Sequence, residues 1–263
     1  MNIHFNDNEL FEHLKFNTIF EINVGSSMYN LTSKNSDVDK LHIYLESKEN
    51  ANSVFRTHHQ LQYKNNNIDY LFTSLTQFIN NILSADSTIN YEVLKTDYFR
   101  LKFPELYNAM NFENLEIAKS YLGMCRRDFK SIATYEEKNE KLHKKLYHFV
   151  RGVLFAESII YDKKLFGEDS VLLEYNELLS NIKNMKISEK EFFEIRYAYF
   201  DLMQEYRELV DEKIKNKKND ISIYRNIDKA IFNIYSEYSE LEVIDYKDYI
   251  YDALINNKFN YLQ

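Results

Sequence analysis

The scarcity of backbone breakers constrains the fold of this chain more than any other feature of its sequence. Among its 263 residues there are four glycines and one proline. These two residue types most often interrupt helices and strands, so long uninterrupted elements are expected. The sequence after residue 105 is charged and rich in Leu, Tyr and Phe, a composition that favours helices.

The first part of the chain has a different pattern. Runs of β-branched and aromatic residues predict strands at 17–24, 37–46, 59–64 and 67–72, after a short helix at 7–15. From Ser74 onward, apolar residues recur at spacings of three and four, which is typical of helices. The helices predicted after Ser74 include 87–95, 104–109, 113–136, 139–161, 188–217, 221–238 and 244–256, with a charged helix end or loop at 211–220. We therefore expect a sheet-containing domain at residues 1–103 and a helical domain at residues 104–263, with Pro104 at the boundary.

Charge and cysteine content limit the class of protein. The net charge of −8 argues against a general nucleic-acid binder, which needs an excess of Lys and Arg, although a local basic groove is compatible with it. The single cysteine, Cys125, is expected to be a small buried side chain. The N-terminal residues are polar and acidic, unlike a signal peptide, and no apolar run approaches the roughly 18 residues of a membrane span. We therefore expect a soluble, cytoplasmic protein.

One polar stretch, GSSMYNLTSKNSDVD at residues 25–39, has a pattern with chemical meaning. Side chains alternate along a strand, so Asp37 and Asp39 are expected on one face. Two carboxylates on one face repel each other unless a cation lies between them, which predicts a divalent metal such as Mg²⁺. At the other end, Gly25 lets the backbone approach a phosphate, and a short helix from Ser26 would offer N–H groups to an anion.

Each half of this pattern also has a purely structural interpretation. Pairs of aspartates are common at exposed strand ends, and Gly-Ser steps are common in loops. Because the two halves occur together after an apolar strand, we favour a phosphate and metal site. Tyr29 would either stack on a base or pack beneath the loop.

These residues resemble the signature of the DNA polymerase β-type nucleotidyltransferase superfamily, and more closely that of its YcgL-like branch of predicted nucleotidyltransferases. The branch pattern is G-S-x-x-Y-G, five residues, then S-D-x-D. The chain matches it at Gly25, Ser26, Tyr29, Ser36, Asp37 and Asp39. Asn30 stands where the branch has glycine, and Asn tolerates a positive φ better than most residues. Lys40 stands where the superfamily has an apolar residue, which weakens the expected packing on that face of the strand.

The resemblance covers about residues 15–210 and implies an α+β fold, with a small mixed-sheet nucleotidyltransferase core and an all-helical C-terminal domain. It implies that carboxylates of the core bind Mg²⁺, with Mn²⁺ as the alternative ion. The residues to which it assigns this catalytic and metal-binding role are Asp37, Asp39 and Asp69. Glu46 or Glu92 is the alternative to Asp69 as the third carboxylate.

The helix predicted at 139–161 has a basic face, because Lys144, His148 and Arg151 recur at i, i+4 and i+7. One interpretation is a solvated face opposite the apolar stripe of the helix. The resemblance instead implies a cationic face that contacts a triphosphate or a nucleic-acid backbone. The full set of nucleotide-binding residues expected on this basis is Gly25, Ser26, Ser36, Lys144, His148 and Arg151.

The activity implied by the resemblance is transfer of a nucleoside monophosphate from an NTP to a hydroxyl acceptor, with release of pyrophosphate. The acceptor would be an RNA 3′ end such as that of a tRNA, a protein side chain or a small molecule. The resemblance does not separate a repair enzyme from a toxin-like enzyme, and it does not predict an oligomeric state. The non-enzymatic alternative is a catalytically silent nucleotide-binding module, although such a module has no need of two facing carboxylates.

Overall fold

The computed structural model describes residues 2–4, 8–29, 31, 38–46, 60–65, 67–112, 114–134, 139–216, 221–238 and 260–261. Contacts divide the chain into two compact units, one made of Met1–Asn81 with Lys229–Gln263 and the other of Ile82–Asp228. We call them the sheet unit and the helical unit. The division follows packing, and the domain boundary expected at Pro104 stays a prediction.

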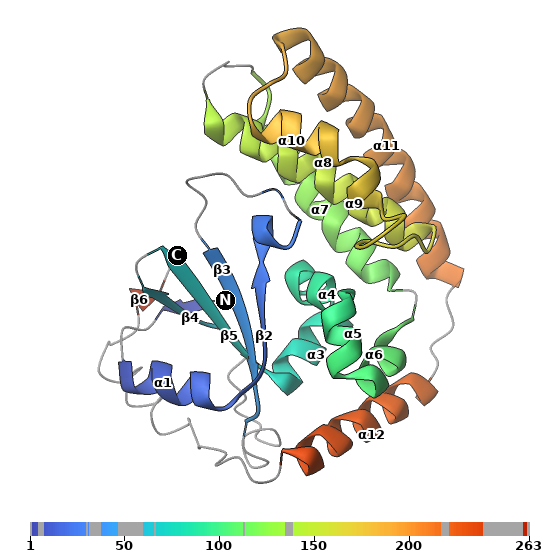
Figure 1. The fold of residues 1–263 in the computed structure, drawn as a ribbon. Helices are drawn as coiled ribbons and strands as arrows, with labels where there is room; N and C mark the ends of the chain where they lie inside the picture. Colours follow the sequence, from blue (N-terminus) through green and yellow to red (C-terminus); the bar gives the residue numbers. More distant parts are fainter. Residues whose placement is uncertain are drawn as a thin grey trace. The chain divides into compact units, whose positions relative to one another are not determined.

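Within its described residues, the sheet unit contains a six-stranded mixed sheet with the strand order β2-β3-β5-β4-β1-β6. The strands are β1 (Asn2–His4), β2 (Thr18–Val24), β3 (Val38–Tyr44), β4 (Gln60–Asn65), β5 (Ile68–Ser74) and β6 (Asn260–Tyr261) (Figure 1). β3 is parallel to β5 and β1 to β4, whereas the β2–β3, β4–β5 and β1–β6 pairs are antiparallel. A small mixed sheet with many helices after it in sequence confirms the expected α+β fold.

Helix α1 (Asn8–Phe16) packs against one face of the sheet through an aromatic cluster. The Phe11 ring stacks on Tyr63 at a centroid distance of 4.4 Å and contacts Tyr70 and Phe72 edge-on at 4.9 and 5.9 Å. Tyr70 and Phe72 are two residues apart on β5, so alternation puts both on this face. Asp69 and Leu71, which alternate with them along β5, point to the opposite face.

The helical unit is a layered arrangement of helices. Its elements are α4 (Thr88–Leu94), α5 (Asp97–Lys102), α6 (Pro104–Met110), α7 (Leu115–Ser131), α8 (Glu140–Ile160), α9 (Val171–Glu174), α10 (Asn176–Lys183) and α11 (Glu189–Asn216). α7 and α8 lie side by side, α11 packs against both, and α10 packs against α8 (Figure 1). Two further helices, α3 (Leu75–Leu83) and α12 (Ile221–Glu237), cross the division between the units.

Helix α8 confirms the amphipathic pattern predicted at 139–161. Asn139 caps it, because its Oδ1 accepts a hydrogen bond of 3.1 Å from the backbone N–H of Leu142. The predicted apolar stripe is buried, with Leu146, Phe149 and Val153 fully inaccessible to solvent. Burial of such side chains against neighbouring helices supplies most of the stability of a helix in a protein.

Helices α7 and α8 approach closely where a glycine meets a cysteine. A Cβ atom added to Gly152 on α8 would lie 2.5 Å from Cys125 Sγ on α7. Cys125 Sγ donates a hydrogen bond of 3.3 Å to the Phe149 carbonyl oxygen, and its side chain is buried, as predicted. The absence of a side chain at Gly152 therefore sets how closely the two helices pack.

The structure also contains short elements that the sequence pattern does not predict. These elements are β1, β6, α5, α9 and α10. None of them is long enough to show a clear hydrophobic period. The helix predicted at 244–256 lies outside the described residues. Among the described helices, none has both the length and the apolar character needed to cross a membrane.

Candidate functional site

Two aspartates lie opposite each other on neighbouring inner strands of the sheet. The parallel register of β3 and β5 pairs Asp39 with Asp69. Residues paired across two strands point to the same face, and neighbouring strands are about 4.8 Å apart. Figure 1 shows β3 and β5 side by side. The fold therefore brings together two of the carboxylates that the sequence assigned to one site.

Gly25 joins the other half of the motif to the same place. It follows β2, whose last residue, Val24, pairs with Asp39. Gly25 has a φ of +65°, and an added Cβ atom would lie 2.9 Å from Asp39 Oδ2. Both the left-handed backbone and the missing side chain are thus required next to this carboxylate. The Gly-Ser step and the second aspartate of the motif are therefore adjacent in the fold.

The short helix expected from Ser26 is a single 3₁₀ turn, η1 (Gly25–Ser27). The N–H of Met28 donates a hydrogen bond of 3.1 Å to the carbonyl oxygen of Gly25. The N–H of Leu31 donates one of 3.0 Å to the carbonyl oxygen of Ser26. Such a turn is too short for a helix dipole, which corrects the expectation of a helix N-terminus. Tyr29 is buried, which favours packing beneath the loop over stacking on a base.

Ser36 and Asp37 lie outside the described residues. Strand β3 begins at the next residue, Val38, whose N–H donates a hydrogen bond of 3.0 Å to the Asn67 carbonyl oxygen. The expectation that Asp37 shares a face with Asp39, and the role of Ser36, stay predictions.

Lys64 is a charged neighbour of the site that the sequence analysis missed. β4 and β5 pair Lys64 with Asp69, and Lys64 Nζ lies 3.2 Å from Asp69 Oδ1. The lysine side chain is 57% exposed and the aspartate side chain 21% exposed. Only the register of an antiparallel strand pair shows this neighbour, so sequence spacing alone could not have found it.

The two alternatives for the third carboxylate belong to other elements than the paired ends of β3 and β5. Glu46 follows the opposite end of β3 from Asp39, and its Oε1 accepts a hydrogen bond of 3.0 Å from Ser74 Oγ. Glu92 lies in the helical unit, where its Oε1 accepts a hydrogen bond of 2.6 Å from the Tyr121 hydroxyl. Within the sheet unit, strand register thus favours Asp69 over Glu46.

The donors on this face suit Mg²⁺. Mg²⁺ in phosphate-transferring sites is usually held by one or two carboxylates and keeps several waters. Asp39 and Asp69 supply two carboxylates on one face, and the absence of a side chain at Gly25 lets the first of them lie against the backbone there. In the part of the chain that the structure describes, no group of three or more His, Cys, Asp or Glu side chains could hold a metal. Asp37, the third ligand expected from the sequence, lies outside these residues.

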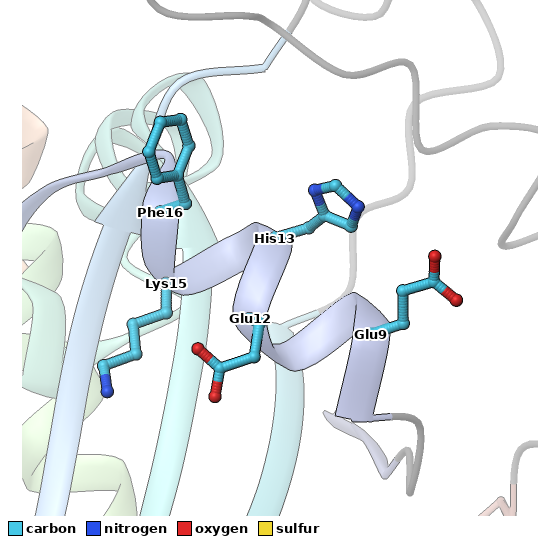
Figure 2. Close-up of a pocket in the computed structure, with 5 residues that line it drawn as sticks. All are labelled: Glu9, Glu12, His13, Lys15 and Phe16. Atoms are coloured by element: carbon cyan, nitrogen blue, oxygen red, sulfur yellow. The ribbon is translucent and has the colours of Figure 1, made fainter.

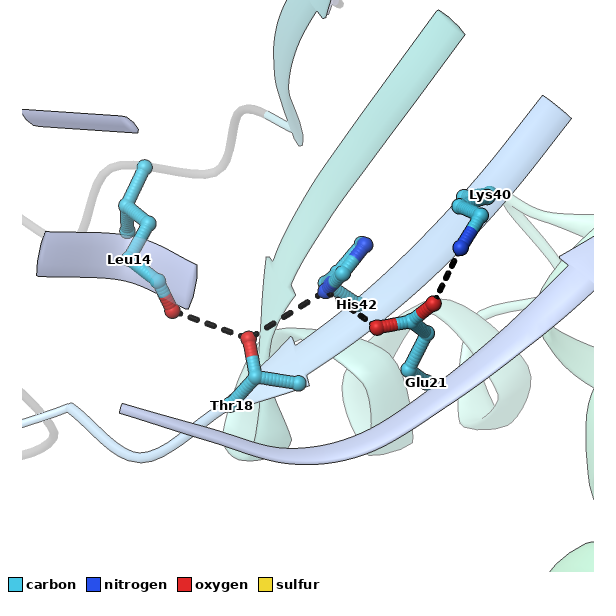
Figure 3. Close-up of polar contacts among 5 residues, drawn as sticks. All are labelled: Leu14, Thr18, Glu21, Lys40 and His42. Carbon is cyan, nitrogen blue, oxygen red and sulfur yellow. Dashed lines mark hydrogen bonds and ion pairs between the residues drawn. The ribbon is translucent and has the colours of Figure 1, made fainter. Parts of the chain in front are cut away.

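The opposite face of β2 and β3 carries a polar network (Figure 3). Lys40, which replaces the apolar residue of the superfamily, forms an ion pair with Glu21 on β2. The expected weakening of packing at Lys40 is therefore compensated by a charged partner. Burial acts to raise the pKa of Glu21, but the hydrogen bond from Lys40 and nearby positive charges lower it overall.

His42 is the buried member of this network. Thr18 Oγ1 donates a hydrogen bond of 2.9 Å to the Leu14 carbonyl oxygen and lies 3.3 Å from His42 Nδ1 (Figure 3). Because the hydroxyl has only one hydrogen, Nδ1 must carry a proton and donate it to Thr18. Burial lowers the pKa of His42 to about 4, against the opposing charge of Glu21. His42 is therefore neutral at pH 7.

The basic residues predicted on α8 form a partly buried cluster with a fourth member from α10. Lys183 Nζ and Arg151 Cζ lie 5.7 and 5.6 Å from the centroid of the Tyr147 ring. Burial, with the charges of Arg151, Lys144 and Lys183, lowers the pKa of His148 to about 3. His148 is thus not a cation at pH 7, which corrects that part of the cationic-face prediction. Burial and neighbouring cations also lower the pKa of Lys183.

A hollow of about 500 Å³ lies along the outer side of α1. The described residues that line it are Glu9, Glu12, His13, Lys15 and Phe16 (Figure 2). These side chains point away from one another, and they combine opposite charges with one exposed ring. No set of groups converges here on a ligand, so we assign no site to this hollow.

Comparison with known proteins gives one match. The family model of the RNA repair pathway DNA polymerase beta family matches residues 6–222. The matched range includes the Gly25–Asp39 motif, Asp69 and the whole of α8. No curated protein and no solved structure matched the chain significantly.

Proposed function

The chain belongs to the RNA repair pathway DNA polymerase beta family, and from this premise we propose that it transfers a nucleoside monophosphate from an NTP to a hydroxyl acceptor, releasing pyrophosphate. Membership of the family makes it a DNA polymerase β-like nucleotidyltransferase. The observation that carries the proposal is the pairing of Asp39 with Asp69 across β3 and β5, with the side-chain-free backbone of Gly25 directly against the Asp39 carboxylate. This arrangement suits a metal-bound triphosphate.

Asp39 and Asp69, together with Asp37, would hold Mg²⁺, or Mn²⁺ in its place. When bound, the ion would offset the negative charge of the phosphates and of the attacking and leaving oxygens. Lys64, which lies 3.2 Å from Asp69, has to turn away before this carboxylate can bind metal fully. Its side chain is 57% exposed, so it can turn toward solvent or toward a substrate phosphate.

Asp69 would also receive the proton of the acceptor. As the acceptor oxygen forms a bond to the α-phosphorus, its proton passes to a carboxylate oxygen of Asp69. The bond from the α-phosphorus to the bridging oxygen then breaks, and pyrophosphate leaves with the electron pair. Ser26, Ser36 and the backbone amides of the Gly25 turn would donate hydrogen bonds to the outgoing phosphates.

The cluster on α8 and α10 would bind phosphate. Lys144, Arg151 and Lys183 bring several positive charges together, and this repulsion is relieved when an anion lies among them. His148, being neutral, would contribute a hydrogen bond rather than a charge. We therefore keep Lys144, His148 and Arg151 as nucleotide-binding residues and add Lys183.

We propose an RNA 3′ end, such as that of a tRNA, as the acceptor. The family description names an RNA repair pathway, which favours RNA over a protein side chain. The acidic net charge of −8 does not oppose this, because the α8 cluster supplies a local positive surface. Such an enzyme would act in the cytoplasm.

The test is incubation of the full chain with each labelled NTP, Mg²⁺ or Mn²⁺, and RNA or protein acceptors. We expect label on RNA with the wild type and a loss of at least about a hundredfold in Asp39→Asn and Asp69→Asn. Asp201→Asn, an exposed aspartate on α11, is the matched control and should keep full activity. Equal labelling by wild type and both site variants would contradict the proposed roles.

One observation favours the non-enzymatic alternative, a silent nucleotide-binding module. Lys64 already gives Asp69 a cationic partner, so the Asp69 carboxylate has a partner for its negative charge without a metal ion. In the catalytic interpretation, Mg²⁺ should raise the melting temperature of the wild type and not that of Asp39→Asn. NTP binding without metal dependence and without transfer to any acceptor would instead establish the module.

A further inference from the structure

The helical unit contains a cavity of about 550 Å³ that belongs to neither the carboxylate site nor the α8 cluster. Its walls come from α4, the start of α5, the end of α6 and the residues after it, the end of α8, and the loop at 161–168. All of its lining residues lie in the helical unit. The volume falls within the range of about 300–1,000 Å³ that is usual for small-molecule sites.

Lys95, at the end of α4, gives the cavity a half-buried ammonium group. Lys95 Nζ donates a hydrogen bond of 2.7 Å to Asn111 Oδ1 and lies 5.4 Å from the centroid of the Tyr91 ring. An ammonium group has three hydrogens to donate, and Lys95 forms no ion pair with any residue that the structure describes. The group is therefore equipped to bind an anion that enters the cavity.

Two of the three other cationic side chains that line the cavity already form ion pairs with carboxylates. Arg100 pairs with Asp97 at 2.8 Å, and Lys163 pairs with Glu157. Lys164, on the loop at 161–168, forms no ion pair within the described part of the chain. Lys95 and Lys164 are thus the two cations of this cavity with charge to offer a ligand.

The remaining lining supplies flat rings and two carboxylates. Tyr107, Phe112 and Phe166 line the cavity, and aromatic rings of this kind bind nucleobases by stacking. Asp162 and Glu168 also line it, and the charge of Asp162 acts on Lys95 and Tyr91. A carboxylate beside cations rejects a simple polyanion but accepts a ligand that also carries hydroxyl or amino donors.

We propose that this cavity binds a nucleoside monophosphate unit, with its phosphate at Lys95 and Lys164 and its base against the rings of Tyr107, Phe112 and Phe166. Asp162 accepts hydrogen bonds from the sugar hydroxyls or the base amino group. A lone phosphate would leave the rings unused, and an apolar ligand would leave the charges unmatched. The site goes beyond the proposed transfer reaction, and its ligand is either a free nucleotide or the terminal nucleotide of an RNA.

The experiment is calorimetric titration of the full chain with adenosine 5′-monophosphate, in EDTA so that no metal loads the carboxylate site. We expect saturable binding that weakens at least about tenfold in Lys95→Met and in Lys164→Met. Adenosine, which lacks the phosphate, should bind the wild type as weakly as the monophosphate binds these variants. Lys190→Met, an exposed lysine on α11, is the matched control and should bind like the wild type.

Asp39→Asn separates this proposal from the catalytic one, because it should impair transfer and leave this binding unchanged. If Lys95→Met does not fold, as judged by circular dichroism, the exposed Lys164→Met carries the test. A short RNA that displaces the monophosphate identifies an RNA end as the ligand, and failure to displace it identifies a free nucleotide. Three results overturn the proposal: no binding of the monophosphate or of RNA at millimolar concentration, wild-type affinity in both lysine variants, or loss of binding in Asp39→Asn.

Discussion

At the scale of single residues, the backbone conformation of Gly25 and its lack of a side chain determine where the Asp39 carboxylate can lie. The φ of +65° at Gly25 costs a side-chain-bearing residue about 1 kcal/mol or more, and an added Cβ atom would lie 2.9 Å from Asp39 Oδ2. Gly25→Ala should therefore displace the Asp39 carboxylate or distort the η1 turn. We expect nucleotidyl transfer to fall at least about a hundredfold, while the chain stays folded.

The measurement is transfer activity together with the melting temperature. Gly123→Ala is the matched control, because no atom lies within 4 Å of an added Cβ atom there and helix α7 gains propensity. If Gly25→Ala keeps full activity, the carboxylate at Asp39 does not need its present position, and the proposed site is wrong.

The residues of the motif could be predicted from sequence because their chemistry is local. Gly25 and Asp39 follow from a fixed spacing and a strand period of two, and the fold places them in contact. Lys64 and Lys183 could not be predicted in this way. Each contacts its partner, Asp69 or Tyr147, from a different strand or helix, and only the packing of elements sets that pairing.

At the scale of elements, the contact between α7 and α8 depends on one glycine. Alanine at Gly152 would put a Cβ atom 2.5 Å from the Sγ atom of the buried Cys125, so one of the two side chains or the helix pair itself must shift. Overpacking of this kind costs about 1–3 kcal/mol, against a gain of about 1 kcal/mol in helix propensity. We expect Gly152→Ala to lower the free energy of unfolding by up to about 2 kcal/mol in urea denaturation.

Cys125→Ala provides the check, because it removes the sulfur atom that the new methyl group meets. In that background Gly152→Ala should be neutral or stabilising, so the destabilising effect of the substitution is lost or reversed. A loss of stability that is equal in both backgrounds would mean that the close approach at Cys125 does not control the helix pair.

Elements with a clear period were predictable and short ones were not. Helix α8 was predicted because its apolar stripe extends over several turns, and all of that stripe is buried. α5 and α9 span six and four residues, and their ends depend on the side chains of Thr96 and Ser170, which accept hydrogen bonds from backbone N–H groups. Such caps are single-residue signals that the hydrophobic pattern does not contain.

At the scale of the whole molecule, stability should depend on pH through buried histidine. His42 is fully buried, and its pKa of about 4 lies below the 6.5 of an unfolded chain. Between these pH values the unfolded chain binds a proton that the folded chain does not, so stability decreases as pH falls from 6.5 toward 4. The difference in pKa corresponds to about 3 kcal/mol of unfolding free energy. His148 in the helical unit has a pKa of about 3, so it too makes the folded chain less stable as the pH falls below 6.5.

Urea denaturation of the full chain at several pH values between 4 and 7 measures this dependence. The charged groups that act on the pKa of His42 are Glu21 on β2, Lys40 on β3 and Lys15 on α1, and Figure 3 shows the first two beside the histidine. His42→Asn keeps a donor near Thr18 and removes the titration, and it should flatten the decrease even if it lowers stability at pH 7. His13→Asn, at an exposed position on α1, should keep the wild-type slope. If His42→Asn and the wild type lose stability equally as the pH falls, the neutral buried histidine is not what makes the sheet unit sensitive to acid.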